Sequence, residues 1–259
     1  MAGRSREQGR TVTSRALAVL EAFDATHVRL SLSDIARRSD LPLATAYRLV
    51  KELETWQALV RRPDGLYEIG AKLWTLGLLS PIFGDLRDQA FPYMQDVYEL
   101  CRETVQLAVR DDLDALYVEK IYGRKSVPLL NRSGTRLPLH ATGVGKVLLA
   151  HAPRPVIQRA VHQLSRITPY TVTHPGRLSQ ELAQIHTRGY ATTTEEMQLG
   201  TCSLAVPVRD NSGVVVAGLG IVARSSRRDL IRLLPALQAA AAGIGSHLNA
   251  SVLPASMLG

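Results

Sequence analysis

The sequence predicts an α+β protein with an N-terminal winged helix-turn-helix domain, a linker helix and a C-terminal domain of helices and antiparallel hairpins. Two observations predict this fold class. A capped helix, a second helix that begins at a proline and a Pro-Asp-Gly hairpin follow one another within residues 31–70. From residue 85 onward, helical patterns are mixed with apolar strands joined by short turns. Because 259 residues exceed the usual single domain, we assign residues 1–70 to the first domain, 71–84 to the linker helix and 85–259 to the second domain.

The first domain begins with a supporting helix. Apolar residues recur at helical spacing from Val12 to Phe23, which predicts a helix over about residues 14–23. A second helix starts at Ser31, which forms a capping box with Asp34, so that each side chain satisfies an unpaired amide. Pro42 suits the first turn of a third helix, because its missing amide hydrogen would have no partner there. Two short helices therefore flank a tight turn.

The third helix, over residues 43–54, has one face for packing and one for a partner. Its inward face is apolar at Ala46, Leu49, Val50 and Leu53. Its outward face carries side chains of the kinds that contact phosphates and bases in a major groove: Ala44, Thr45, Tyr47, Arg48 and Lys51. Taken alone, either cation is more often a solvated surface residue. The succession of motifs around them is what predicts DNA binding.

A two-stranded wing follows the third helix. Arg62-Pro63-Asp64-Gly65 places proline and glycine as a type I turn requires, between strands at residues 59–62 and 66–69. Arg61 and Arg62 precede the tip, where we expect one of them to hold a phosphate of the DNA backbone. The leading arm carries four further cations that we expect to contact DNA, in an arm that is disordered without it: Arg4, Arg6, Arg10 and Arg15.

Residues 71–79 form a strongly apolar helix that is broken near Pro81 and Gly84. An exposed apolar helix usually pairs with a second copy of itself. We therefore expect the linker helix to form the seam of a homodimer.

The second domain is predicted to be an α+β domain with helices on one side of a sheet. Helical patterns cover residues 85–102, 141–151, 155–164, 178–188 and 228–248, with Pro235 either kinking the last helix or marking a later start. Strands cover residues 104–109, 115–118, 203–209 and 214–222, and the last two are joined by a glycine-containing turn.

Charge and cysteine content limit the class of protein. The net charge of +8 fits a nucleic-acid partner, but the first 70 residues hold 11 basic against nine acidic residues, so bulk charge supports DNA binding only weakly. The two cysteines are too few and too separated for a disulfide framework, which indicates a reducing compartment. The sequence has neither the apolar core of a signal peptide nor an apolar run of membrane-spanning length. We expect a cytoplasmic protein with no membrane partner.

The second domain offers no positive evidence for catalysis, a metal or a cofactor. Residues 143–146 match part of a phosphate-binding loop, but His140 and Val147 stand where that loop needs glycine and Ser or Thr. Glu195 and Glu196 are neighbours whose side chains point apart in a strand or turn, which favours a solvated pair over catalytic carboxylates. The seven histidines show no metal-ligand spacing with the two cysteines.

With no catalytic or metal site predicted, we expect the second domain to contain a ligand-binding cavity. Gly143 and Gly145 at a helix start would let a ligand approach free backbone amides, which favours a carboxylate or another anion. Alternatively, these glycines only make a tight strand-to-helix turn. The residues alone leave both interpretations open.

Several motifs, taken in order, resemble the IclR family of bacterial transcriptional regulators. They are residues 14–20, 34–36, 41–49 and 67–70 in the first domain, and residues 138–146, Thr171, Gly189-Tyr190, Glu195-Glu196 and residues 200–208 in the second. The resemblance implies a GAF-like effector-binding domain, a dimer that can pair into a tetramer, and an operator with inverted half-sites in adjacent major grooves. It also implies that a small-molecule effector shifts the relative placement of two DNA-binding domains.

The resemblance further implies an effector pocket lined, by motif position, by Gly143, Val144, Thr193, Ser203, Gly220 and Val222. The family often has an acid near Thr193, a cysteine at Ser203 and serines at Gly220 and Val222, so this pocket is expected to be less polar overall and the family's small oxoacid effectors are not transferred. An anionic or partly apolar effector is expected. In the third helix, Leu43 and Ala44 replace a frequent lysine and serine, which puts the family's base preferences in doubt.

We therefore predict a ligand-responsive transcriptional regulator, an activator or a repressor, that binds double-stranded DNA and is not an enzyme. Two alternatives stay open. One is a metabolic enzyme with an accessory DNA-binding-like domain, which the missing catalytic constellation disfavours. The other is an effector-free DNA-binding protein.

Overall fold

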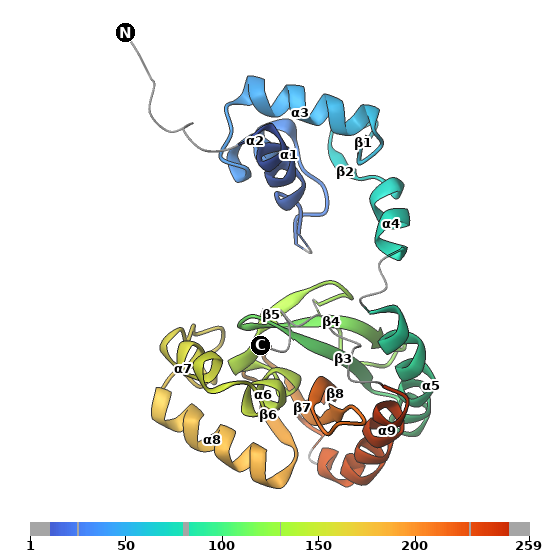
Figure 1. Cartoon of the computed structure of the whole chain (residues 1–259), viewed down its shortest axis with the longest axis vertical. Coiled ribbons are helices and arrows are strands. Elements are labelled where there is room, and N and C mark those ends of the chain that lie inside the picture. Colours follow the sequence, from blue (N-terminus) through green and yellow to red (C-terminus); the bar gives the residue numbers. More distant parts are fainter. Residues whose placement is uncertain (1–10, 25, 80–82, 130, 228, 249–259) are drawn as a thin grey trace. The chain divides into compact units, whose positions relative to one another are not determined.

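The computed structural model describes residues 11–24, 26–79, 83–129, 131–227 and 229–248. The chain divides into two compact units, Met1–Ser80 and Pro81–Gly259 (Figure 1). Three of the arm cations, Arg4, Arg6 and Arg10, lie outside the described residues. The fourth, Arg15, belongs to the first helix, so its assignment to the arm is wrong.

The first unit consists of helices around a small hairpin. Its elements are α1 (Val12–Glu21), α2 (Leu32–Arg38), α3 (Leu43–Thr55), β1 (Leu59–Arg61), β2 (Tyr67–Ile69) and α4 (Ala71–Leu78). The three predicted N-terminal helices and the wing are therefore confirmed. One buried cluster joins them, and Val19, Ile35, Val50 and Tyr67 are its central members. Leu30 adds a bridge to Tyr67, which ties the segment before α2 to the wing.

Local sequence signals determine these elements. Ser31 Oγ accepts the amide of Asp34 at 3.1 Å and donates to its carboxylate at 2.7 Å, so the cap at the start of α2 forms as expected. Pro42 is the N-cap residue of α3. At the wing tip the Gly65 amide donates to the Arg62 carbonyl at 3.0 Å, and Gly65 has a φ of +83°, which favours glycine.

The second unit is built on one antiparallel sheet of six strands in the order β5-β4-β3-β8-β7-β6. The strands are β3 (Thr104–Asp111), β4 (Asp114–Ile121), β5 (Arg136–Pro138), β6 (Ala191–Thr194), β7 (Thr201–Arg209) and β8 (Val215–Arg224). The two edge strands, β5 and β6, were not predicted. They have only three and four residues, too few for a clear alternation of polar and apolar side chains.

Helices cover both faces of this sheet, so the prediction of helices on one side is wrong (Figure 1). One face packs against α5 (Gly84–Cys101) and α9 (Leu234–Ser246), and the other against α6 (Gly143–Ala150), α7 (Arg154–His162) and α8 (Pro175–Arg188). Every residue of β3 except Asp111 is buried, and a strand buried on both faces gives a continuous rather than an alternating apolar run.

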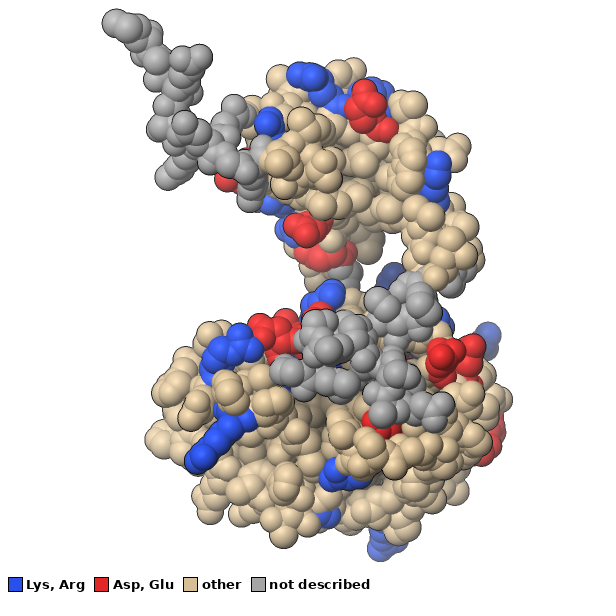
Figure 2. Space-filling model, in the orientation of Figure 1, with Lys and Arg blue, Asp and Glu red and all other residues tan. Residues whose placement is uncertain are grey.

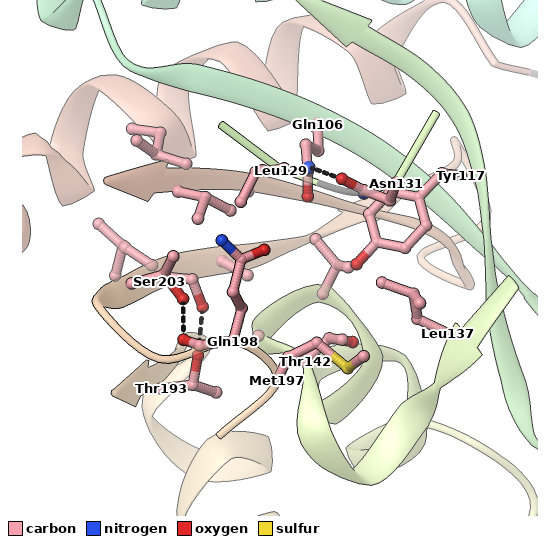
Figure 3. Close-up of a pocket in the computed structure, with 18 residues that line it drawn as sticks. Gln106, Tyr117, Leu129, Asn131, Leu137, Thr142, Thr193, Met197, Gln198 and Ser203 are labelled. Carbon is pink, nitrogen blue, oxygen red and sulfur yellow. Dashed lines mark hydrogen bonds between the residues drawn. The ribbon is translucent and has the colours of Figure 1, made fainter. Parts of the chain in front are cut away.

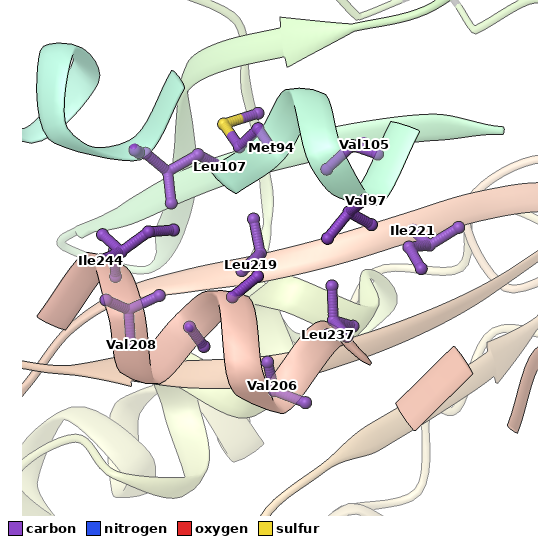
Figure 4. Packing of buried hydrophobic residues seen from close by; sticks show 14 of the residues in the cluster. Met94, Val97, Val105, Leu107, Val206, Val208, Leu219, Ile221, Leu237 and Ile244 are labelled. Carbon is purple, nitrogen blue, oxygen red and sulfur yellow. The ribbon is translucent and has the colours of Figure 1, made fainter. Parts of the chain in front are cut away.

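The larger core lies between the sheet and helices α5 and α9. Figure 4 shows Met94 and Val97 of α5 and Leu237 of α9 facing Leu107 and Leu219 of the sheet. The last helix begins after a short turn, η2 (Leu230–Leu233), with Pro235 in its first turn, so the later start is the outcome that the structure bears out. Within the described residues, no helix combines the length and the apolar character needed to span a bilayer.

Candidate functional site

Helix α3 presents its predicted DNA-facing side chains to solvent. Ala44 and Arg48 are exposed and Tyr47 is 48% exposed, whereas Thr45 is half-buried. Arg48 makes no hydrogen bond or ion pair with any residue that the structure describes, so its guanidinium is available for an anionic partner. Figure 2 shows positively charged side chains over α3, with acidic side chains among them.

Lys51, also on α3, is less available than the sequence suggested. Its ammonium donates to the Glu54 carboxylate at 2.8 Å and lies 6.0 Å from the centre of the Tyr47 ring. The contact with Glu54 raises the pKa of Lys51, so the side chain is charged but already paired. An exposed pair of this kind is weak and can be exchanged for a phosphate contact.

The two wing arginines also differ in whether a carboxylate already pairs with them. The guanidinium of Arg62 lies 3.2 Å from the Glu68 carboxylate and 3.8 Å from that of Asp64. Arg61 is exposed, and its guanidinium lies 5.8 Å from the centre of the Tyr67 ring. Arg61 therefore carries the less compensated positive charge of the wing. Arg15, the remaining predicted DNA contact, is half-buried on α1.

The six residues predicted to line an effector pocket lie around one cavity in the second unit. This cavity has a volume of about 120 Å³ and lies where the start of α6 meets the sheet (Figure 3). Its lining includes Gly143, Val144, Thr193, Ser203, Gly220 and Val222. Sequence reasoning missed six polar lining residues, which are Gln106, Tyr117, Asn131, Thr142, Gln198 and Thr201.

Glycines bring α6 close to the sheet. Thr142 caps α6 by accepting the Gly145 amide at 3.1 Å. A Cβ added at Gly143 would overlap the hydroxyl of Ser203, and one added at Gly145 would overlap the carbonyl oxygen of Leu139. The tight-turn interpretation of these glycines is thus supported by geometry, and the same close approach makes Gly143 part of the cavity wall.

The cavity lining combines apolar side chains with polar groups on two sides, and Figure 3 shows the Gln198 amide between those sides. On one side the hydroxyls of Thr193 and Ser203 are 2.6 Å apart, and on the other the Gln106 amide donates to Asn131 at 3.3 Å, near Tyr117 (Figure 3). Burial raises the pKa of the Tyr117 phenol above its usual range, so the phenol is neutral. No Asp, Glu, Lys, Arg or His is among the described residues that line the cavity.

Residues 195–200, between β6 and β7, form a further wall of the cavity. Met197 and Gln198 contribute its lining. The Gln198 side chain donates to the Pro128 carbonyl at 2.9 Å, and the Gln198 carbonyl accepts the Thr201 hydroxyl at 2.6 Å. Residues 195–200, which we call the wall segment, are thereby joined to the connection between β4 and β5.

The Glu195-Glu196 pair is not a solvated pair, so that prediction is wrong. Glu196 is buried, and its carboxylate accepts from the ammonium of Lys146 at 2.7 and 2.8 Å. Glu195 accepts from the Gly200 amide and the Ser225 hydroxyl, so the two carboxylates do point apart. Lys146 is fully buried in these contacts and does not face the cavity, which agrees with the rejection of a phosphate loop. Within the described ranges, no cluster of His, Cys, Asp or Glu could hold a metal ion.

A winged helix-turn-helix unit followed by an α+β unit with a small internal cavity defines a DNA-binding transcriptional regulator that also has an effector-binding domain. The family model "IclR helix-turn-helix domain" matches residues 12–63, and the model "Bacterial transcriptional regulator IclR C-terminal" matches residues 84–246. The chain belongs to the IclR family.

Named relatives match most of the chain. The HTH-type transcriptional regulator XynR of Escherichia coli (strain K12) is 31% identical over 218 residues, which cover 83% of this chain and 86% of the relative. The HTH-type transcriptional repressor AllR of the same strain is 30% identical over 224 residues, which cover 85% and 83%. The crystal structure of an IclR homolog from Microbacterium hydrocarbonoxydans, complexed with 4-hydroxybenzoate, is 35% identical with a TM-score of 0.85, and the match covers 93% of this chain and all of that one.

Proposed function

We propose that this regulator binds an inverted-repeat operator through α3 and changes its DNA affinity when a small molecule occupies the cavity. Arg48, with Ala44, Thr45 and Tyr47 beside it, contacts bases in the major groove. Arg61 holds a backbone phosphate, and Lys51 exchanges Glu54 for another. The exposure of Arg48 and Arg61 supports these roles.

We infer that the effector is a small cyclic compound with polar groups at two opposite ends, such as an aromatic hydroxy acid. The observation that carries this proposal is the cavity of about 120 Å³, which is polar on two sides and has no charged residue among its described lining. An apolar cavity of about 150 Å³ binds benzene, so a cavity of about 120 Å³ limits the ligand to one small ring. The amides at the start of α6 and the neighbouring hydroxyls would hold a carboxylate without a cation. The 4-hydroxybenzoate complex of the Microbacterium hydrocarbonoxydans homolog supports the same class of ligand.

We further propose that α4 forms a dimer seam. Trp74 and Leu76 of this helix are 68% and 45% exposed, and Leu79, directly after it, is 74% exposed. Apolar side chains exposed to this extent are usually covered by a partner. A homodimer would place two α3 helices on two half-sites, and two dimers can share one operator.

The proposal is tested by selecting operators from random DNA and then measuring binding with and without 4-hydroxybenzoate and related ring acids. We expect a selected site with inverted half-sites, and a ligand-dependent change in its Kd. In a thermal-shift screen of the full chain against the same compounds, a compound that binds should raise the melting temperature. A flat response to a broad metabolite panel would favour the effector-free alternative, and turnover of a bound compound would favour the enzyme.

A further inference from the structure

A buried lysine with two carboxylates lies beside the cavity. Lys146 has no exposed surface, and its ammonium is 2.7 Å from Glu196 and 2.9 Å from Glu181. The Glu181 side chain is 21% exposed, whereas that of Glu196 is 9% exposed. One carboxylate is enough to neutralise one ammonium, so charge balance alone does not account for the second.

Glu196 and Glu181 belong to different parts of the second unit. Glu181 lies on helix α8, which packs against α6 and α7 through buried leucines of its own. Glu196 lies in the wall segment, directly before the cavity residues Met197 and Gln198. Burial raises the pKa of Glu196, so placing this carboxylate inside has a free-energy cost that its contacts must offset.

Further contacts fix Glu196 at its backbone. The Thr171 hydroxyl donates to the Glu196 carbonyl at 2.7 Å, and the Thr168 hydroxyl donates to the Glu195 carbonyl at 2.6 Å. The Val172 amide donates to the Glu196 carboxylate at 3.4 Å. Glu195 has a φ of 58°, a left-handed conformation that is unfavourable for a residue with a side chain. The wall segment therefore needs such contacts to keep this shape.

Lys146 connects this segment to α6. It lies on α6 about one turn after Gly143 and Val144, which line the cavity. We propose that Lys146 and Glu196 are a positioning pair, which fixes the wall segment against the start of α6 and thereby sets the affinity of the cavity for its ligand, while Glu181 adds only a second negative charge beside Lys146. The affinity clause rests on the proposed effector-binding function, whereas the fixing of the segment does not.

The test compares Glu196→Ala with Glu181→Ala in the full chain. Each variant leaves Lys146 with one carboxylate, so neither creates a buried unpaired charge. Hydrogen exchange followed by mass spectrometry measures the wall segment without any ligand. We expect amides of residues 195–200 and of Val172 to exchange about tenfold faster or more in Glu196→Ala, with β7 and β8 unchanged. Glu181→Ala should stay within about twofold of the parent.

Two results would overturn the pair's role. Equal acceleration by both variants would make Glu181 and Glu196 equivalent, and uniform acceleration over the whole unit would mean that Glu196 acts only on global stability. If Glu196→Ala does not fold, Glu196→Gln keeps the side-chain shape and is compared with Glu181→Gln by the same criteria.

Calorimetry with 4-hydroxybenzoate tests the affinity clause. We expect the Kd to rise about tenfold in Glu196→Ala and to stay within about threefold in Glu181→Ala. If Glu196→Ala changes hydrogen exchange but not the Kd, the pair positions the wall segment without setting the affinity of the cavity. If the parent does not bind this compound, the proposed effector class is wrong, and the exchange measurement still decides the positioning role.

Discussion

Helix α3 and the effector cavity bring together candidate functional residues in different ways. The side chains proposed to face DNA lie within residues 44–51 of one helix, are largely exposed, and include Arg48, which pairs with no described residue. The cavity side chains come from residues 106–222, are mostly buried, and include no charged group among the described lining residues. The first surface depends on local sequence, and the second depends on the register of a whole sheet.

DNA binding and ligand binding are therefore expected to depend on different forces. The proposed contacts of Arg48 and Arg61 with DNA are electrostatic and should weaken with salt. Binding in the cavity depends on shape and on a few hydroxyl and amide groups, and is much less sensitive to salt. Substitutions in one unit should therefore leave the other function largely intact.

Gly145→Ala is expected to have the largest effect, and it tests whether the two units are independent. The added Cβ meets the Leu139 backbone, which cannot move without displacing α6, so the second unit should lose about 3 kcal/mol of unfolding free energy. Both tryptophans, Trp56 and Trp74, lie in the first unit. Urea unfolding followed by far-UV circular dichroism should shift, while the tryptophan fluorescence transition should not.

The control for Gly145→Ala is Gly84→Ala, at the start of α5, where an added Cβ meets open space. It should leave both transitions unchanged. A shift of the fluorescence transition in Gly145→Ala would show that the units unfold together.

Arg48→Ala should have the next largest effect and concerns only DNA. Operator binding should weaken by about 1–3 kcal/mol, with relaxed sequence preference, because a base contact is lost. Fluorescence anisotropy on operator and random duplexes measures both. Arg37→Ala is the matched control, since Arg37 is an exposed cation already paired with Asp34 at 2.8 Å. Equal losses on both duplexes would reject base contact by Arg48.

Arg61→Ala should have a smaller and sequence-independent effect. The slope of log affinity against log salt should flatten by about one unit, because one phosphate contact is lost. Arg62→Ala should change the slope less, since Glu68 and Asp64 already offset the charge of Arg62. A larger change in Arg62→Ala than in Arg61→Ala would reverse this assignment.

The smallest predicted effect is a dependence of the second unit's stability on pH through His151. Burial lowers the pKa of His151 below its usual 6.5, and the nearby charge of Arg209 acts in the same direction. As pH falls through 6.5, the unfolded chain takes up the proton first, so unfolding free energy decreases down to the folded-state pKa. Thermal melts from pH 8 to 5 should show less acid destabilisation in His151→Gln than in the parent.

Much of the first unit could be predicted from sequence, because its signals are local. Ser31 and Asp34 form a cap with each other, Pro42 starts the next helix, and the wing turn closes within four residues. The exposure of Arg48 also followed from helical periodicity. The pairing of Lys51 with Glu54 was missed, although three-residue spacing on a helix is a visible signal.

The cavity could be predicted only in part. Six lining positions were assigned through family motifs, but Gln106 was not, because its place depends on pairing of β3 with β8, where Gln106 lies opposite Gly220. Asn131 and Gln198 reach the cavity from connections whose paths no local pattern determines. The burial of Glu196 likewise depends on Lys146, 50 residues away.

Gly220 on β8 leaves space between the sheet and Val144, where an added Cβ would come within 2.8 Å of the Val144 side chain. A hydroxyl-bearing residue at Gly220 would force the β-branched Val144 side chain to move and so reshape the cavity, in a different unit from α3. A lineage of such proteins can thus acquire sensitivity to a new metabolite by a single codon change while continuing to control the same genes.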